Sequence, residues 1–363
     1  MVLAGGGTGG HVYPGLAVAG ALETEMRARA EALEMLYIGV RGRVDEAIVP
    51  ASGIRFRAID AGQLRVGSPV TFVRNLARLA RGIVQSIFLL RGFRADVVFA
   101  TGGYASVPVG VAARMLRRPL VVYLPDVTPG WAVRLLSRLA TRMATTSEAA
   151  LAYLPRRKTG VVGYPVRDEF WQTDRTAARA ALGLPESAKV LLVTAGSLGA
   201  QAINETVFAA LPELLAACEI VHVTGAAGEA RAAERRAQLG AEAQRRYHVR
   251  GYLAEMPAAM VAADLVVSRA GASVLGELPA AGAPAVLVPG EYEGWSQTPN
   301  AAYLRSQGAA VMLRNSELAQ LAPAVLALLA DDARLAEMRE AMRGLARPGA
   351  ARDLARVVLE AAA

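Results

Sequence analysis

The stretch GGGTGGHVYPG, Gly5 to Gly15, stands almost at the start of the chain, directly after the short apolar run Met1 to Ala4. Gly5, Gly7 and Gly10 match the pattern G-x-G-x-x-G, which joins a strand to a helix in nucleotide-binding units. Glycine lets the backbone approach a ligand closely, and free N–H groups at a helix start favour an anion. The stretch therefore predicts a Rossmann-like unit that holds an anionic ligand.

Short apolar runs rich in β-branched residues alternate with Ala- and Leu-rich stretches along the chain. This rhythm is typical of βαβ units, so each half is expected to form a parallel sheet covered by helices. The expected strands are residues 34–40, 56–60, 95–100, 119–125 and 141–146 in the first half and 189–195, 220–225, 263–268 and 284–289 in the second.

The chain has 363 residues, which is long for one core and suits two domains. The alternation breaks at VVGYPVRDEFWQTD, residues 161–174, where glycine, proline and aromatic residues interrupt it. We therefore expect an α/β protein with two parallel-sheet domains, residues 1–164 and 165–348, facing a cleft. By pattern alone, the tail 349–363 can pack on either domain.

The composition limits the location, the kinds of site and the partners that the chain is expected to have. No apolar run is long enough to span a membrane and the first residues lack a leader pattern, so we expect a cytoplasmic protein. The single Cys218 and the scattered His11, His222 and His248 predict neither a disulfide nor a metal site. A net charge of +8 favours an anionic partner.

His11 directly follows the glycine loop, on the first turn of the predicted helix. An imidazole there can accept a proton from a sugar hydroxyl, or it can merely hydrogen-bond the loop. A dinucleotide site is the other interpretation. The second strand is followed by Arg41 and Arg43 instead of the acidic residue that binds an NAD ribose, so an oxidoreductase would use NADP.

Six motifs, in this order and at this spacing, resemble the MurG family of N-acetylglucosaminyltransferases. They read GGGTGGHVYPGLAVAGAL, ATGGYASVPVGVAA, VVGYPVRDEF, GSLGAQAIN, VVSRAGASVLGELPAAGAPAVLVP and SQTPNAAYL. The resemblance implies the GT-B fold, with the helix 349–363 returning to the first domain. It also implies an inverting transfer, without a tightly held metal or other cofactor, of GlcNAc from UDP-GlcNAc to undecaprenyl-pyrophosphoryl-MurNAc-pentapeptide (lipid I), giving lipid II for peptidoglycan.

The resemblance also implies roles for individual residues. His11 is the candidate catalytic base, beside Thr8, Gly9 and Gly10. The N–H groups of Gly271, Ala272 and Ser273 hold the diphosphate, and Glu277 binds the ribose diol. The remaining matches to donor-binding positions are Arg167, Ser197, Gln297 and Leu253, whose backbone meets the uracil. Glu277 can instead be an exposed helix carboxylate, and Arg167 can simply pair across the linker.

Three departures from the family pattern fall near the expected sugar site. Asp126 stands where the family has asparagine, Leu198 replaces a glutamine, and GWSQ, Gly294 to Gln297, replaces Asp-x-Gln-Gln. A carboxylate accepts hydrogen bonds but cannot donate them as an amide does, which can shift donor choice. Another donor sugar, a diacylglycerol-type acceptor and a nonenzymatic binder of lipid-linked sugars therefore stay open.

Residues 65–94 combine arginines with bulky apolar residues at helical spacing. The apolar side is expected to comprise Val73, Leu76, Leu79, Ala80, Ile83, Ile87 and Leu90, and another side carries Arg74, Arg78 and Arg81. Such a helix can cover a sheet, or it can dip into an anionic leaflet with Phe72, Phe88 and Leu89. The resemblance implies membrane binding through the first domain, and so a peripheral protein on the inner face of the cell membrane. No nucleic-acid motif is present.

Overall fold

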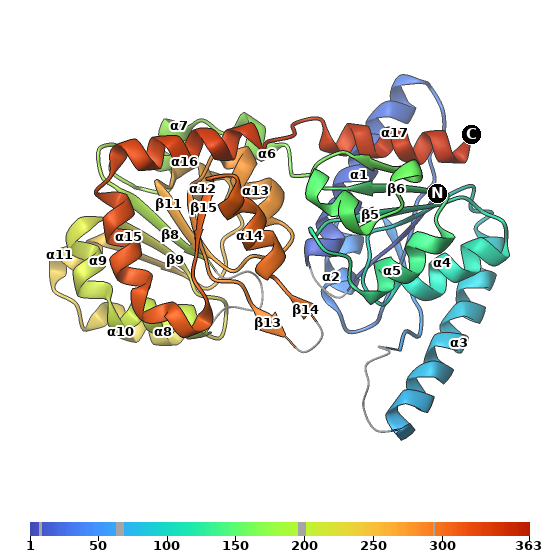
Figure 1. The fold of residues 1–363 in the computed structure, drawn as a ribbon, viewed down its shortest axis with the longest axis horizontal. Helices are drawn as coiled ribbons and strands as arrows, with labels where there is room; N and C mark the ends of the chain where they lie inside the picture. Colours follow the sequence, from blue (N-terminus) through green and yellow to red (C-terminus); the bar gives the residue numbers. More distant parts are fainter. Residues whose placement is uncertain (7–8, 63–68, 195–200, 293–294) are drawn as a thin grey trace. The chain divides into compact units, whose positions relative to one another are not determined.

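A computed structural model describes residues 1–6, 9–62, 69–194, 201–292 and 295–363. It divides into two compact units, each with its own parallel sheet (Figure 1). The first unit is Met1–Val166 with Pro348–Ala363, and the second is Arg167–Arg347. The predicted interruption at residues 161–174 contains the point where the chain leaves the first unit.

The sheet of the first unit has the strand order β3-β2-β1-β4-β5-β6-β7, with every neighbouring pair parallel. Helices cover both of its faces, which explains why its central strands are apolar at successive positions. The strands are β1 Val2–Ala4, β2 Leu36–Gly39, β3 Arg55–Ala58, β4 Val98–Ala100, β5 Leu120–Leu124, β6 Arg142–Thr145 and β7 Thr159–Val161.

The helices of the first unit are α1 Gly9–Ala28, α2 Val44–Ala51, α3 Pro69–Gly92, α4 Ser106–Met115, α5 Trp131–Leu139 and α17 Ala350–Ala362, with short 3-10 helices at Glu148–Tyr153 and Arg156–Lys158. One core lies between the sheet and α3, α4 and α5, and the other between the sheet and α1, α2 and α17. Leu354, Ala355 and Val358 place α17 in the second of these cores.

The sheet of the second unit has the order β10-β9-β8-β11-β12-β15, again all parallel. Its strands are β8 Val190–Thr194, β9 Glu219–Val223, β10 Tyr247–Arg250, β11 Leu265–Ser268, β12 Ala285–Leu287 and β15 Ala310–Met312. A separate antiparallel hairpin consists of β13 Glu291–Tyr292 and β14 Trp295–Ser296.

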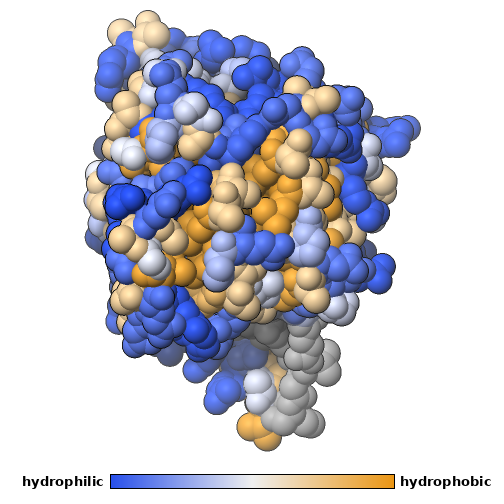
Figure 2. All heavy atoms as spheres, turned by 90° about the vertical axis from the view of Figure 1, so that its left-hand side faces the viewer, coloured by the Kyte–Doolittle hydropathy of each residue, from blue (hydrophilic) through white to orange (hydrophobic). Residues whose placement is uncertain are grey.

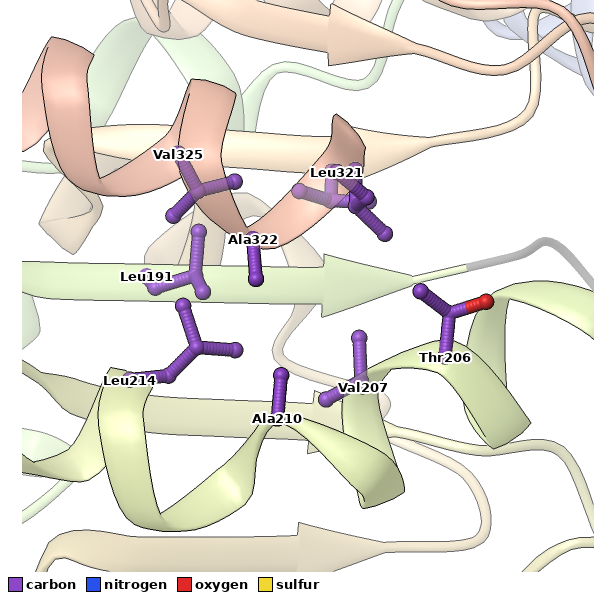
Figure 3. Close-up of a pocket in the computed structure, with 9 residues that line it drawn as sticks. Leu191, Thr206, Val207, Ala210, Leu214, Leu321, Ala322 and Val325 are labelled. Atoms are coloured by element: carbon purple, nitrogen blue, oxygen red, sulfur yellow. The ribbon is translucent and has the colours of Figure 1, made fainter. Parts of the chain in front are cut away.

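The helices of the second unit are α6 Glu169–Gln172, α7 Arg175–Ala181, α8 Gln201–Ala209, α9 Leu211–Ala217, α10 Glu229–Ala237, α11 Ala241–Arg246, α12 Met256–Ala262, α13 Val274–Ala281, α14 Thr298–Ser306, α15 Leu321–Leu329 and α16 Asp332–Gly344, with a 3-10 helix at Asn315–Gln320. The core between the sheet and α8, α9 and α15 includes Leu191, Leu214 and Val325 (Figure 3). The gap lined by these side chains is too narrow for a water molecule, so it belongs to the packing of the core.

The surface of the second unit is mixed in character. Figure 2, seen from the side where α9 and α11 lie in Figure 1, shows apolar side chains near the middle of the face with hydrophilic side chains among them. Such mixing is ordinary for a protein surface. Among the described residues, no helix is long and apolar enough to cross a bilayer.

Every strand expected from an apolar run forms, and the predicted fold class of two Rossmann-like parallel sheets is confirmed. β7, β10, β15 and the β13–β14 hairpin were not expected. β7, β10 and β15 are edge strands of their sheets. In β7 and β10, polar residues such as Thr159, His248 and Arg250 interrupt the apolar pattern. The hairpin is too short to show an alternating pattern.

Strand order reverses between β1 and β4 in the first sheet and between β8 and β11 in the second. In open parallel sheets, ligands bind at such reversals, beyond the carboxyl ends of the strands. The glycine loop with His11 follows β1, and the loop before α13 follows β11. The topology thus places the two groups of candidate residues where each sheet can bind a ligand.

Candidate functional site

His11 is the third residue of α1, and its ring is fixed by a partner from the next strand of the sheet. The Nδ1 atom lies 2.9 Å from the carbonyl oxygen of Thr101, the residue after β4. A carbonyl can only accept, so in the neutral ring Nδ1 carries the proton and Nε2 has a free lone pair. Nε2 is therefore the atom of His11 that can accept a proton.

Two glycines after Thr101 pack against this imidazole and against Gly6. Gly102 and Gly103 have φ angles of 94° and 75°, which L side chains rarely adopt. A Cβ atom at Gly102 would lie 3.4 Å from Cε1 of His11, and one at Gly103 would lie 2.6 Å from the carbonyl oxygen of Gly6. The motif ATGGYAS therefore places its two glycines against His11 and Gly6.

The first turns of α1 are supported from the end of the first unit. Pro14 lies inside α1 and has no N–H, so the carbonyl of Gly10 lacks its usual helical donor four residues on. The hydroxyl of Tyr164 donates to that carbonyl at 3.3 Å. Tyr164 is buried and stands just before the chain enters the second unit. This contact fixes the backbone next to His11.

Asp126 follows β5, the strand beside β4, at the same end of the sheet as Thr101. Its side chain is largely buried. Burial raises the pKa of Tyr123, and the negative charge of Asp126 raises it further. The Tyr123 hydroxyl donates to the carbonyl oxygen of Gly163 at 2.9 Å. Asp126 therefore lies at the same end of the sheet as His11.

The ribose-binding carboxylate that an NAD site needs does not follow β2, as the sequence predicts. Arg41 and Arg43 are exposed there, and the acidic residue that follows them, Asp45, is fully buried. Oδ2 of Asp45 accepts from the N–H of Val40 at 3.1 Å, and it lies so close to Gly6 that a Cβ there would be 2.6 Å away. Asp45 is therefore packed against Gly6 inside the first unit.

The second group of candidates surrounds the turn before α13. The backbone N–H groups of Gly271, Ala272 and Ser273 donate no hydrogen bond to any described residue. Gln297 holds this turn, because its Oε1 accepts from the N–H of Ala270 at 3.1 Å. Such unsatisfied N–H groups at a helix start suit an anion.

Glu277, one turn into α13, is brought together with two other candidates. Burial raises the pKa of the Glu277 carboxyl, while a hydrogen bond with Ser273 and the positive charge of Arg167 lower it. Arg167 belongs to the second unit, so this electrostatic partnership lies within one compact body. A partly buried carboxylate beside free N–H groups can accept hydrogen bonds from neighbouring hydroxyls.

Leu253 follows β10 and is buried, so its backbone is held in a fixed position. The residue before it, Tyr252, is 77% exposed. The sequence analysis named Leu253 and not Tyr252, because the strand β10 that precedes them was not expected. A ring in this position can stack on a flat heterocycle.

Some expected site residues are not brought together here. Thr8 and Ser197 lie outside the described residues, as do Leu198 and Gly294. Gly9 opens α1. The other two histidines have partners of their own in the second unit. His222 is fully buried between Tyr247 and Asn204, and burial lowers its pKa to about 3, so it stays neutral near pH 7.

Comparison with known proteins gives the family. The glycosyltransferase family 28 N-terminal domain matches residues 1–145, and the family's C-terminal domain matches residues 190–354. The UDP-N-acetylglucosamine--N-acetylmuramyl-(pentapeptide) pyrophosphoryl-undecaprenol N-acetylglucosamine transferase of Roseiflexus sp. is 41% identical, over 97% of this chain and 93% of its own. The chain belongs to this transferase family. The transferase of the same name from Desulforudis audaxviator is 38% identical, over 96% of this chain and 95% of its own.

Solved structures of proteins with different functions match the fold of this chain. MurG from Acinetobacter baumannii matches with a TM-score of 0.73 at 24% identity, over 99% of this chain and 98% of its own. A UDP-GlcNAc 2-epimerase from Neisseria meningitidis bound to UDP-GlcNAc matches with a TM-score of 0.68 at 14% identity, over 99% of both chains. A transferase and an epimerase thus share this architecture, so the reaction must be argued from residues.

Proposed function

We propose that the chain transfers GlcNAc from UDP-GlcNAc to undecaprenyl-pyrophosphoryl-MurNAc-pentapeptide (lipid I), forming lipid II. The observation that carries the proposal is His11, whose Nδ1 is bonded to the Thr101 carbonyl and whose Nε2 can take a proton. It stands in a chain 41% identical to a transferase named for this reaction. A dehydrogenase would have no role for the turn before α13 or for Glu277.

In the proposed reaction, the acceptor hydroxyl attacks the anomeric carbon of GlcNAc. Its oxygen forms the new glycosidic bond while its proton passes to Nε2 of His11. The bond between the anomeric carbon and the diphosphate oxygen breaks, and its electron pair leaves with UDP. Attack from the face opposite the leaving group inverts the anomeric centre. By the family resemblance, Thr8, Gly9 and Gly10 contact the substrates beside His11.

The second unit supplies the donor site of this proposal. The free N–H groups of Gly271, Ala272 and Ser273 receive the diphosphate, whose negative charge grows as the bond breaks. Glu277 accepts hydrogen bonds from the ribose hydroxyls, and the Leu253 backbone meets the uracil. Arg167 adds positive charge beside Glu277. Ser197, Gln297 and Asp126 complete the donor contacts that the family resemblance implies.

An assay with radiolabelled UDP-GlcNAc and lipid I tests this function. We expect labelled lipid II with the inverted anomeric configuration, and little transfer from UDP-glucose. Diacylglycerol as the acceptor and NADPH oxidation are the comparison arms. Product on diacylglycerol but not on lipid I would replace the acceptor, and stabilisation by NADP without any effect of UDP would overturn the transferase proposal.

We also propose that the protein is cytoplasmic and binds the inner face of the cell membrane through α3. The expected apolar side is buried only toward the end of the helix, at Leu90, whereas Val73 and Leu76 are exposed. α3 extends away from the sheet at its N-terminal end (Figure 1). Its solvated part thus offers apolar surface that packing against α4 leaves uncovered.

A second apolar stripe runs along α3, at helical spacing and opposite Leu90. Its exposed members are Val70, Val84 and Phe88, and Phe88 is 70% exposed. Arg74 and Arg78 are exposed beside it. Apolar side chains flanked by arginines are typical of helices that lie in an anionic membrane surface, where each basic residue contributes about 1 kcal/mol.

We expect the double substitution Val84→Ser and Phe88→Ser to weaken binding to anionic phosphatidylglycerol vesicles by about tenfold or more, because two apolar side chains no longer leave water. Vesicle sedimentation at rising salt measures this. Tyr153→Ser, which removes another exposed aromatic side chain, is the control and should bind as the unmodified protein does. Equal partition onto neutral and anionic vesicles would contradict the proposed contribution of the arginines to membrane binding.

A further inference from the structure

Tyr292 and Trp295 form an exposed pair of stacked rings on the β13–β14 hairpin. They face each other across its two strands, with ring centroids 5.2 Å apart and ring planes inclined by 19°. Tyr292 is 52% exposed and Trp295 39% exposed. Each ring covers one face of the other, so the outer faces and edges of the pair stay accessible, and exposed aromatic surface is common at binding sites.

The hairpin is anchored to the sheet behind it. The N–H of Gln297 donates to the carbonyl of Gly290 at 2.9 Å, and the N–H of Gly290 donates to Oε1 of Gln297 at 2.8 Å. The Tyr292 ring lies over Gly290, where a Cβ would come within 2.7 Å of it. Arg269 donates to the carbonyl of Val288 at 3.1 Å just before the hairpin. The aromatic pair is therefore held in place before any ligand arrives.

The same Gln297 links the hairpin to the turn before α13. Its Oε1 accepts from both Gly290 and Ala270, so one buried side chain fixes the base of the hairpin and the start of the turn. Asn300 strengthens this link by donating to the carbonyl of Ala270 at 3.0 Å. In a nucleotide sugar, the sugar is bonded directly to the diphosphate. A donor whose diphosphate occupies the turn would carry its sugar within reach of the hairpin.

We propose that Tyr292 and Trp295 form a stacking surface for the pyranose ring of the nucleotide-linked sugar. The proposal rests on the donor role proposed above for the turn before α13. One face of a pyranose carries C–H groups with partial positive charge, and the face of an aromatic ring is partially negative. A sugar ring can therefore lie flat against the outer face of one of these two rings while its hydroxyls stay hydrated. The surface contributes to binding of the sugar and not of the nucleotide.

Calorimetric titration of the full chain with UDP-GlcNAc and with UDP separates these contributions. We expect Trp295→Ala to raise the Kd for UDP-GlcNAc by about tenfold and to change the Kd for UDP by less than about twofold. Trp295→Phe keeps an aromatic face and should retain most of the affinity for UDP-GlcNAc. Trp131→Ala is the matched control, because it removes a tryptophan that is 40% exposed in the first unit.

Three results would overturn the stacking surface. The first is an unchanged Kd for UDP-GlcNAc in Trp295→Ala, and the second is an equal loss for UDP and UDP-GlcNAc, which would mean that the substitution disturbs the turn. The third is an unmodified protein that binds neither nucleotide, which would remove the proposed donor site as well. The first two leave the proposed donor site intact, so failure of the further inference can be told apart from failure of the function.

Discussion

Replacing His11 with alanine is expected to lower kcat for GlcNAc transfer by about 10²- to 10⁴-fold, the usual contribution of a general base. The Kd for UDP-GlcNAc should change little, because the proposed diphosphate, ribose and uracil contacts belong to the other compact unit. The reason for the loss is geometric. The Thr101 carbonyl fixes the ring with Nε2 free, and alanine offers no proton acceptor in that position.

Steady-state kinetics with lipid I, together with nucleotide titration, measure both effects. His248→Ala is the matched control, since this histidine lies in β10 and its Nε2 is bonded to Glu219 at 3.0 Å. It should leave kcat near that of the unmodified protein. An His11→Ala protein with normal turnover would show that another group accepts the proton, and would reduce His11 to a support of the glycine loop.

The sequence predicts the sheets well because their central strands are buried on both faces. Runs such as Leu120–Leu124 are apolar at every position, so they are stable only as strands buried between two layers of helices. The same physics explains the misses. An edge strand such as β15 has only one neighbour in the sheet, so its apolar signal is short, and the hairpin of Tyr292 and Trp295 has no core face at all.

The contacts that give the candidate site its chemistry could not be predicted from local pattern. The partner of His11 is a backbone carbonyl 90 residues away, and any residue type at that position would supply it. Gln297 reaches the turn before α13 from 27 residues away. Such contacts depend on which strands become neighbours. The sequence predicts that α3 is amphipathic, but the spacing of its apolar residues does not show which of them α4 covers and which stay exposed.

Replacing Glu277 with alanine is expected to raise the Kd for UDP-GlcNAc by about tenfold to a hundredfold, the cost of losing hydrogen bonds to a charged acceptor. Any fall in kcat should be smaller, because Glu277 is proposed to bind ribose and does not touch the reacting atoms. Glu213→Ala, which removes an exposed carboxylate from α9, is the control and should leave the Kd unchanged.

The pH dependence of donor binding distinguishes this role from a merely structural one. Because burial raises the pKa of Glu277, its carboxyl takes up a proton at a higher pH than an exposed glutamate does. The protonated form has lost its charge and part of its capacity to accept. Affinity for UDP-GlcNAc should therefore fall as the pH is lowered through this raised pKa. Glu277→Gln cannot titrate, so it should bind more weakly near pH 7 and lose this dependence. If Glu277→Gln kept the same acidic loss as the unmodified protein, the titrating group would lie elsewhere and the ribose role of Glu277 would fail.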